Sequence, residues 1–411
     1  MSARWSDEFL DSKRQITDPQ ADAVVDAVLG EGGDQVQFNA LLQGLVSNAD
    51  PASAAFPEVA RQYFADTRKL PQWADLEKIR QGENFFGRFS PEVILLLMCK
   101  SLPQSYAAAN ATKVLYNTQL LEDDVYRRII ETAQFVLDVM APGGLNPANE
   151  AGHGIRTAQK VRLLHASIRH ILRQRQDPPW EAEEWGEPIN QEDLAGTLLS
   201  FSYLNLDGLK RLGTSLTTEE EETYLHCWNA VGHIMGVDED MMVWTMAEAD
   251  ELWNRMDERQ FRPSDSGMAL TKAIINFMEH IVPGTLFDGF PSAMIRHLVG
   301  ERIADMINVP HNLKIKLEEA FISGPLEHML GDIDAAEDKH SKATKLITKF
   351  NQHLLNGIFM TVQLGKGVQF RIPDSLAQNE RWREVVAPTP IHIHLTPKIG
   401  KWRLVLEKNV D

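Results

Sequence analysis

The segment from Ala151 to Gln176 contains no aspartate or glutamate, although the chain carries 58 acidic residues against 41 lysines and arginines. At the average frequency of the chain, a segment of this length would contain about four acidic residues. Positive charge is therefore concentrated in one part of an acidic protein. Apolar residues recur through the segment at helical spacing, which predicts an amphipathic helix.

On such a helix, steps of about 100° per residue place Arg162, His165 and Arg169 on one face. The opposite stripe is expected to face the core and consists of Val161, Leu164, Ile168, Ile171 and Leu172. Two interpretations stay open. The pattern is typical of a packed helix with a solvated basic face. It also suits an iron porphyrin, because imidazole binds iron and guanidinium groups bind the propionates.

Further segments surround this helix in a fixed order along the chain. Before VRLLHASIRH (161–170) come SLP and YAA (101–108), VLYNT (114–118) and RRIIETAQFV (127–136), and after it come TLLSFS (197–202) and YLHCWNAVGHIMGV (224–237). The ordered set resembles the latex clearing proteins, which are bacterial rubber oxygenases, and the wider family of mpaB-type oxygenases. The resemblance covers roughly residues 55–300.

The resemblance implies a b-type haem with His165 as the proximal iron ligand. It also implies that Arg162 and Arg169 contact the propionates, and that Arg296 supplies a further basic contact. The chain has no Cys-x-x-Cys-His motif, so the haem is expected to be held without covalent bonds.

On the distal side of the haem, the resemblance implies catalytic roles for Arg128 and Thr132. Arg128 would stabilise negative charge that develops on oxygen, and Thr132 would donate or relay a proton. One departure concerns Glu131, because the rubber oxygenases carry a lysine before the threonine. Glu131 is a candidate base for an allylic proton or an ion-pair partner of a neighbouring arginine. Thr112 and Lys113 stand where the family has an acidic residue, so polyisoprene is not carried over as the substrate.

Helical patterns dominate up to about residue 355 and predict an all-α protein with a globin-like core around the haem. We expect an N-terminal helical segment (1–54), a haem-binding oxygenase-like domain (55–310) and a C-terminal part (311–411). Ser90 followed by Pro91 predicts the start of a helix.

The C-terminal part is expected to combine a helical segment with a small β-containing appendage. Alternating residues on either side of a glycine-containing turn predict a hairpin over 359–372. Two more strands are expected at 391–395 and 402–406.

Composition narrows the classes of function. The net charge of −17 argues against nucleic acid as a partner. The longest apolar run, 93–99, is too short for a transmembrane segment. The N-terminus shows no signal sequence, which favours the cytoplasm, and two cysteines, Cys99 and Cys227, are expected to be buried free thiols.

The function expected from these features is haem-dependent oxygenation or oxidative cleavage of an apolar alkene, with isoprenoids as the candidate class. The partners would be O2 and this small substrate, and the oligomeric state is open. Two alternatives are a haem-binding sensor or carrier without catalysis, and a helical interaction protein without a cofactor. A di-iron centre is a third alternative, because Glu-x-x-His strings occur at 150–153 and 337–340.

Overall fold

The structure is a computed structural model that describes residues 4–29, 35–46, 56–117, 122–149, 153–282, 287, 289–311, 339–364, 392–398 and 401–407. Helices make up almost all of it, so the predicted all-α fold is confirmed. The elements are α1 (Asp7–Arg14), α2 (Pro19–Leu29), α3 (Gln35–Val46), α4 (Glu58–Asp66), α5 (Leu76–Leu96), the π-helix η1 (Leu97–Ser101), α6 (Leu102–Ser105), α7 (Ala109–Asn117), α8 (Glu122–Val139), α9 (Gly154–Gln174), α10 (Ala182–Trp185), α11 (Gln191–Phe201), α12 (Tyr203–Arg211), α13 (Thr218–Met235), the 3-10 helix η2 (Glu239–Met241), α14 (Met246–Gln260), α15 (Asp265–Ile281), α16 (Phe290–Val299), α17 (Glu301–Met306), α20 (Lys339–Leu364), β1 (His392–Lys398) and β2 (Lys401–Glu407).

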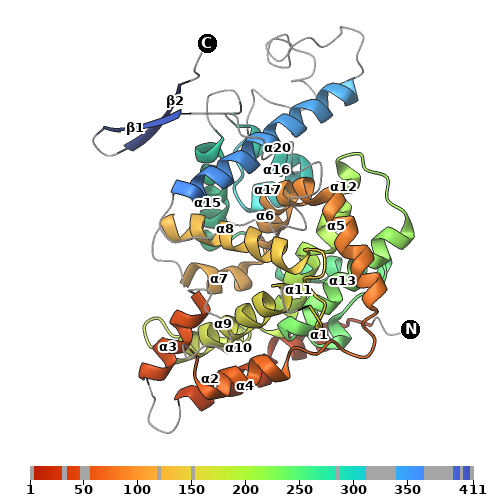
Figure 1. The fold of residues 1–411 in the computed structure, drawn as a ribbon, viewed down its shortest axis with the longest axis vertical. Coiled ribbons are helices and arrows are strands. Elements are labelled where there is room, and N and C mark those ends of the chain that lie inside the picture. The colour runs from red at the N-terminus through yellow and green to blue at the C-terminus, as the bar shows by residue number, and fades with distance from the viewer. Residues whose placement is uncertain are drawn as a thin grey trace.

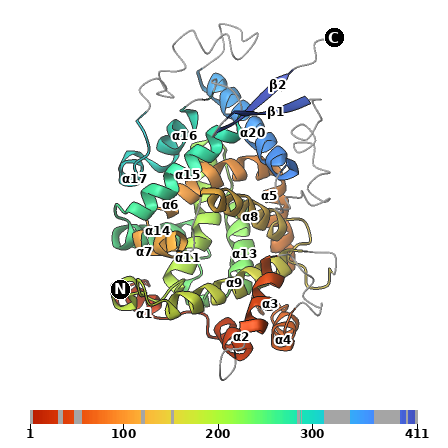
Figure 2. The ribbon, with the colours of Figure 1, turned by 90° about the vertical axis from the view of Figure 1, so that its left-hand side faces the viewer.

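Helix α9, the helix predicted from the acid-free segment, lies at the centre of this arrangement. It packs against α2 and α3 on one side and against α8 and α13 on the other. Both ribbon views show α8 on one side of α9 and α2 with α4 on the opposite side (Figures 1 and 2). Groups on α9 are therefore enclosed by segments that are far apart in the sequence.

The N-terminal helices share a hydrophobic core with later parts of the chain. Val25 and Leu41 from α2 and α3 belong to one cluster of buried residues together with Phe64 of α4 and with Leu163 and Ala166 of α9. The boundary expected after residue 54 therefore does not separate two hydrophobic cores. The division of the chain into three parts, at residues 54 and 310, remains a prediction.

Two local predictions are wrong. No helix starts at Ser90, because α5 begins after the N-cap Asp75 and continues through Pro91 to Leu96. Proline lacks the N–H that would bond to the carbonyl of Gly87, and the Ser90 hydroxyl donates to that carbonyl instead, at 3.4 Å. The first strand of the hairpin expected at 359–372 is also wrong, since residues 359–364 are the end of α20.

The two other strands are present as β1 and β2. They pair antiparallel, with His394 opposite Val405. The rest of the predicted hairpin, 365–372, lies outside the described residues. Among the described helices, none is long and apolar enough to cross a membrane.

The loop between α8 and α9 is anchored by a buried carboxyl group. Glu83 on α5 is only 3% exposed, and its oxygens accept the backbone N–H groups of Gly143 at 2.8 Å and Leu145 at 3.4 Å. Burial raises the pKa of Glu83 to about 7, against the effect of these two hydrogen bonds. The carboxyl group that holds the loop is thus partly protonated at neutral pH.

This raised pKa predicts a specific pH dependence of stability. The folded protein binds more protons at Glu83 than the unfolded chain between about pH 4.5 and 7, so this group stabilises the fold less as the pH rises through that range. The free energy of unfolding of the wild type, minus that of Glu83→Gln, should fall by up to about 3 kcal/mol between pH 5 and 8. Urea unfolding at both pH values measures it, and a difference that does not change with pH would contradict the raised pKa.

Candidate functional site

The arginines of α9 are paired with aspartates of α2. The Arg162 guanidinium donates to both carboxylate oxygens of Asp18, from Nε at 2.5 Å and from Nη2 at 2.8 Å. Arg169 Nε donates to Asp22 Oδ1 at 2.7 Å. Asp18 directly precedes α2 and Asp22 lies in its first turn, so both carboxylates are at the start of the helix that packs against α9.

A solvated basic face is therefore the wrong interpretation of α9. Arg162 is 7% exposed and Arg169 is 1% exposed, which buried charges tolerate only when they are paired. The expected core stripe is also wrong, since Ile171 is 45% exposed and Val161, Leu164 and Ile168 are only partly buried. The buried face of α9 is the one that carries Arg162 and Arg169, and Leu172 belongs to it. The sequence signal that was missed is the spacing of Asp18 and Asp22, which lies far upstream of the basic segment.

His165 lies in the middle of α9 with a neutral imidazole. Burial and the positive charges of Arg169 and Arg128 together lower its pKa to about 4, and Asp18 acts in the opposite direction. The residue as a whole is partly buried, but its Nδ1 is fully buried and has no hydrogen-bond partner among the described residues. Whatever exposure the residue retains thus belongs to its other atoms. A neutral imidazole is the form that binds metal ions.

Helix α8 contributes the predicted distal residues. Arg128 acts on the pKa of His165, which places its charge near the imidazole. Its Nη1 donates to the carbonyl of Leu115 on α7 at 3.3 Å. The Thr132 hydroxyl donates to the carbonyl of Arg128 at 2.7 Å, so it must rotate before it could pass that proton to a substrate. Glu131 is exposed, which favours the ion-pair interpretation over a base in a closed cavity.

Tyr106 is a further candidate that the sequence did not single out. Its side chain is buried, burial raises the pKa of the phenol to about 12, and the charge of Arg128 acts against this rise. The phenol is therefore a neutral hydroxyl close to Arg128. The segment around Tyr106 contributed to the family resemblance, but neither its period nor its spacing distinguished this tyrosine.

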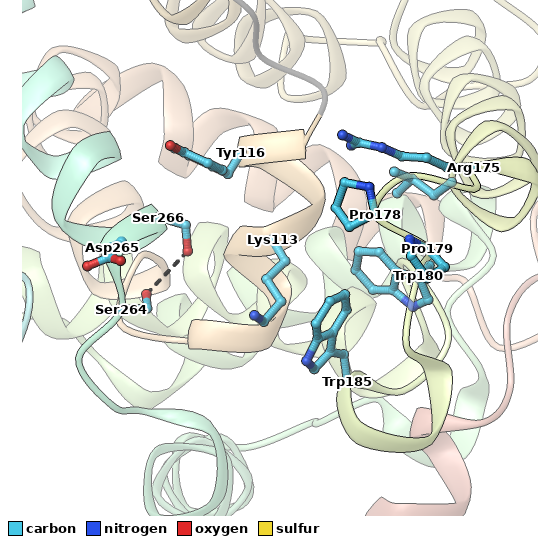
Figure 3. A pocket seen from close by; sticks show the side chains of 11 residues that line it. Lys113, Tyr116, Arg175, Pro178, Pro179, Trp180, Trp185, Ser264, Asp265 and Ser266 are labelled. Atoms are coloured by element: carbon cyan, nitrogen blue, oxygen red, sulfur yellow. Dashed lines mark hydrogen bonds between the residues drawn. The ribbon is translucent and has the colours of Figure 1, made fainter.

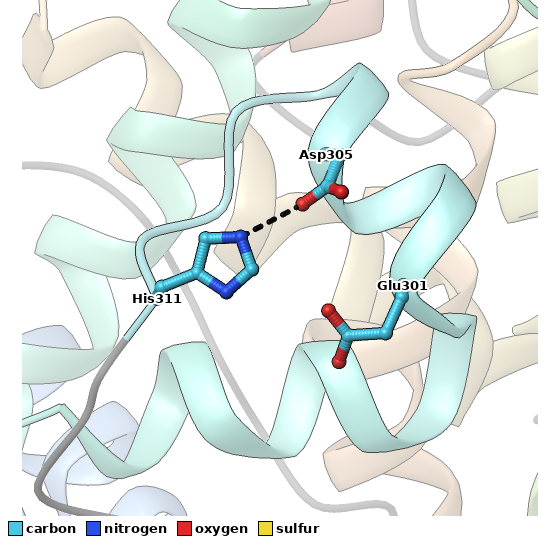
Figure 4. Close-up of side chains that lie close together, drawn as sticks. All are labelled: Glu301, Asp305 and His311. Atoms are coloured by element: carbon cyan, nitrogen blue, oxygen red, sulfur yellow. Dashed lines mark ion pairs between the residues drawn. The ribbon is translucent and has the colours of Figure 1, made fainter.

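Arg296 lies elsewhere in the structure. Its Nη2 donates to Asp305 Oδ1 at 2.7 Å and to the carbonyl of Val309 at 2.6 Å, and it also pairs with Glu301. Figure 4 shows Glu301 and Asp305 with His311, an exposed group in which both carboxylates pair with Arg296. In both ribbon views α16 lies in the opposite half of the molecule from α9, so the structure does not bring Arg296 to His165 (Figures 1 and 2).

The remaining metal alternatives concern the two cysteines and the two Glu-x-x-His strings. Cys99 and Cys227 are buried free thiols, as predicted, and burial holds the pKa of the Cys227 thiol well above its ordinary value. A neutral thiol is a poor iron ligand. The glutamates of both Glu-x-x-His strings, at positions 150 and 337, lie outside the described residues.

The fold is all-α, and two of its packed helices, α8 and α9, carry the guanidinium of Arg128 and the imidazole of His165. These features are the basis for the comparison with known proteins. The family model for the catalytic domain of the ER-bound oxygenase mpaB/B' and rubber oxygenase matches residues 91–318, more than half of the chain. The chain belongs to this oxygenase family.

Two known proteins illustrate the relationship. The rubber oxygenase of Streptomyces sp. (strain K30) is 27% identical over 296 residues, which cover 72% of this chain and 71% of that protein. The solved structure of a latex clearing protein in the closed state matches with a TM-score of 0.68 and 23% identity, over 88% of this chain and 95% of that one. This second likeness shows the fold.

The described residues include an available candidate for the iron ligand, whereas the candidates for the propionates are already paired with aspartates. His165 offers a neutral ring whose buried Nδ1 needs an acceptor. Arg162 borders a cavity of about 530 Å³ that His165 does not line, and its charge is already balanced by Asp18. Propionates at Arg162 or Arg169 would have to share these guanidinium groups with the aspartates, which five donors per guanidinium allow.

Proposed function

We propose that this chain is a haem-dependent oxygenase that acts on an apolar alkene, with isoprenoids as the candidate class. The observation that carries the proposal is His165, a neutral imidazole with an unpartnered buried nitrogen on the central helix of a chain in an oxygenase family. The relative from Streptomyces is a rubber oxygenase, which supports a hydrocarbon substrate.

His165 is the residue that would hold the iron, and Arg162 and Arg169 are the candidates for the propionates. When bound, the haem would supply the redox chemistry that activates O2 for oxygenation or cleavage of a carbon–carbon double bond. The low pKa of His165 keeps the imidazole free of a proton at neutral pH, so no proton competes with the metal.

The residues on the other side of the site act on charge and protons. Arg128 presents a permanent cation from a partly buried position, where it would stabilise negative charge that develops during the reaction. Tyr106, neutral because of its raised pKa, offers a hydroxyl donor in the same region. Thr132 holds its proton on the Arg128 carbonyl and can accept a further hydrogen bond there.

The purified protein tests this proposal through its absorbance spectrum, its iron content and its O2 consumption. A Soret band with stoichiometric iron, and O2 uptake that depends on an isoprenoid alkene such as squalene, are the expected results. A Soret band without such uptake would favour a sensor or carrier. If the protein contained neither haem nor iron, the remaining candidate would be a helical interaction protein.

Variants of α8 supply the matched comparison at the level of residues. Arg128→Ala should retain the Soret band and lower the turnover number by roughly a hundredfold, as removal of one stabilising donor does. Glu131→Gln, which changes an exposed residue one turn along the same helix, should leave turnover nearly unchanged. Equal turnover of Arg128→Ala and the wild type would remove Arg128 from the mechanism.

A further inference from the structure

Three side chains on and just after α17 bring metal-binding atoms together. Glu301 and Asp305 lie four residues apart on α17, so their carboxylates share one face of this helix. His311 follows the helix, and its Nε2 lies 3.1 Å from Asp305 Oδ1. One donor atom from each of the three residues lies within 4.8 Å of the other two (Figure 4). The group thus presents one nitrogen and two oxygens in one place.

The backbone after α17 explains why His311 reaches Asp305. Asn308 has a φ of 56°, a left-handed conformation that asparagine adopts more readily than most residues. The N–H of Asn308 donates to the carbonyl of Asp305 at 3.1 Å, and the N–H of Val309 donates to the carbonyl of Ala304 at 2.8 Å. These bonds end the helix and turn the chain back along it. The path of the backbone therefore carries the exposed imidazole to the carboxylates.

Arg296 positions the two carboxylates without neutralising both. Its guanidinium is 8% exposed and pairs with Glu301 and, at 2.7 Å, with Asp305. It takes one oxygen of each carboxylate, and the other oxygen of each has no hydrogen-bond partner among the described residues. The hydrogen bond from Arg296 lowers the pKa of Asp305, so this group is ionised at neutral pH. One guanidinium against two carboxylates leaves one negative charge and two free oxygens for a cation.

The set of donor atoms fits zinc better than calcium or magnesium. Imidazole and carboxylate are both zinc ligands, whereas calcium and magnesium take oxygen ligands. Zinc holds such ligands at about 2.0–2.2 Å, which places neighbouring ligand atoms of a tetrahedron about 3.3 Å apart. The three donor atoms would have to approach one another by at most about 1.5 Å. Changes of rotamer in exposed side chains supply a shift of this size.

We propose that Glu301, Asp305 and His311 bind one zinc ion, with a water molecule as the fourth ligand. The ion would tie α17 to the residues that follow it. The site lies beside α16 and away from His165 on α9 (Figures 1 and 2). The inference is therefore independent of the proposed oxygenase function and of the haem.

Isothermal calorimetry tests the proposal with zinc chloride and the full chain, after bound metal has been removed with EDTA. The wild type should bind one zinc ion that His311→Ala loses or binds at least about tenfold more weakly, because the loss of a mere outer-shell partner already costs about 10–100-fold. Asp305→Asn should weaken binding in the same direction, since it replaces a charged ligand with a neutral one. Calcium chloride at the same concentration should not displace the zinc.

Two variants control for binding of zinc by isolated side chains. His170→Ala removes an imidazole that lies beside the single carboxylate of Asp26. Asp265→Asn removes an exposed carboxylate from a cavity of about 420 Å³ whose described lining contains no histidine (Figure 3). Both variants should bind zinc as the wild type does. Far-ultraviolet circular dichroism verifies that each variant is folded.

Three outcomes would overturn the zinc site. They are a wild type that binds no zinc, a His311→Ala variant with wild-type affinity, and an equal loss in His170→Ala, which would mean adventitious binding by surface histidines. The variant His165→Ala, which removes the proposed haem ligand, should bind zinc unchanged. A protein without haem that still binds zinc through His311 would refute the proposed oxygenase and leave this inference intact.

Discussion

Replacing His165 with alanine should abolish the Soret band and reduce the iron content to background, while the helical circular dichroism spectrum stays intact. The fold should survive because the imidazole contributes no hydrogen bond from its buried Nδ1, and an unsatisfied buried polar atom costs about 1–3 kcal/mol. Removing the ring therefore removes the proposed iron ligand together with an unfavourable buried group. The measurement is an absorbance spectrum with iron quantified in the same sample.

The matched control lies one and a half turns along the same helix. His170 carries the same side chain on α9, and its Nδ1 lies 3.9 Å from Asp26 Oδ1 at the edge of the structure. His170→Ala should keep both haem and iron. Free imidazole added to His165→Ala should restore part of the Soret band, since it fills the cavity left by the ring. A His165→Ala protein with wild-type haem content would place the iron ligand on another residue.

The sequence predicts α9 well because a helix depends on neighbours three and four residues away. The apolar period and the absence of acids in 151–176 identified the helix that the structure places at the centre of the fold. The environment of the helix was not predictable in the same way. Asp18, which buries Arg162, lies more than a hundred residues earlier in the chain, and pairing over such a distance leaves no periodic signal.

The same distinction explains the local errors. Alternating residues at 359–364 resemble a strand, yet they form the end of α20, because a short alternating run does not by itself decide between strand and helix. Ser90 and Pro91 resemble a helix start, yet a serine hydroxyl compensates the carbonyl that proline leaves free. In the candidate site, His165 and Arg128 came from resemblance, while Tyr106 emerged only from its burial and its proximity to Arg128.

The paired charges between α2 and α9 lead to the largest expected loss of stability. Asp18 is 3% exposed, binds Arg162 through both oxygens, and accepts the N–H of Ala21 at the start of α2. Asp18→Ala should lower the free energy of unfolding by about 3–5 kcal/mol, because it leaves a buried guanidinium without a counter-charge.

Urea unfolding of a double-mutant cycle measures the coupling in this pair. Asp18→Ala with Arg162→Met should be less destabilised than the sum of the two single variants, because no unpaired charge remains. Glu77→Ala, which breaks an exposed pair with Arg80, should change the free energy of unfolding far less. A cycle without coupling would show that Arg162 does not depend on Asp18.

The Asp18→Ala variant also tests whether a haem propionate binds Arg162. If a propionate binds Arg162, it supplies the negative charge that Asp18→Ala removes, so haem should raise the melting temperature of this variant more than that of the wild type. The Arg162→Met variant, which has no guanidinium to pair, should show no such extra gain. Equal shifts in Asp18→Ala, Arg162→Met and the wild type would mean that the arginine serves the packing of α2 on α9 and leaves the propionates to other residues.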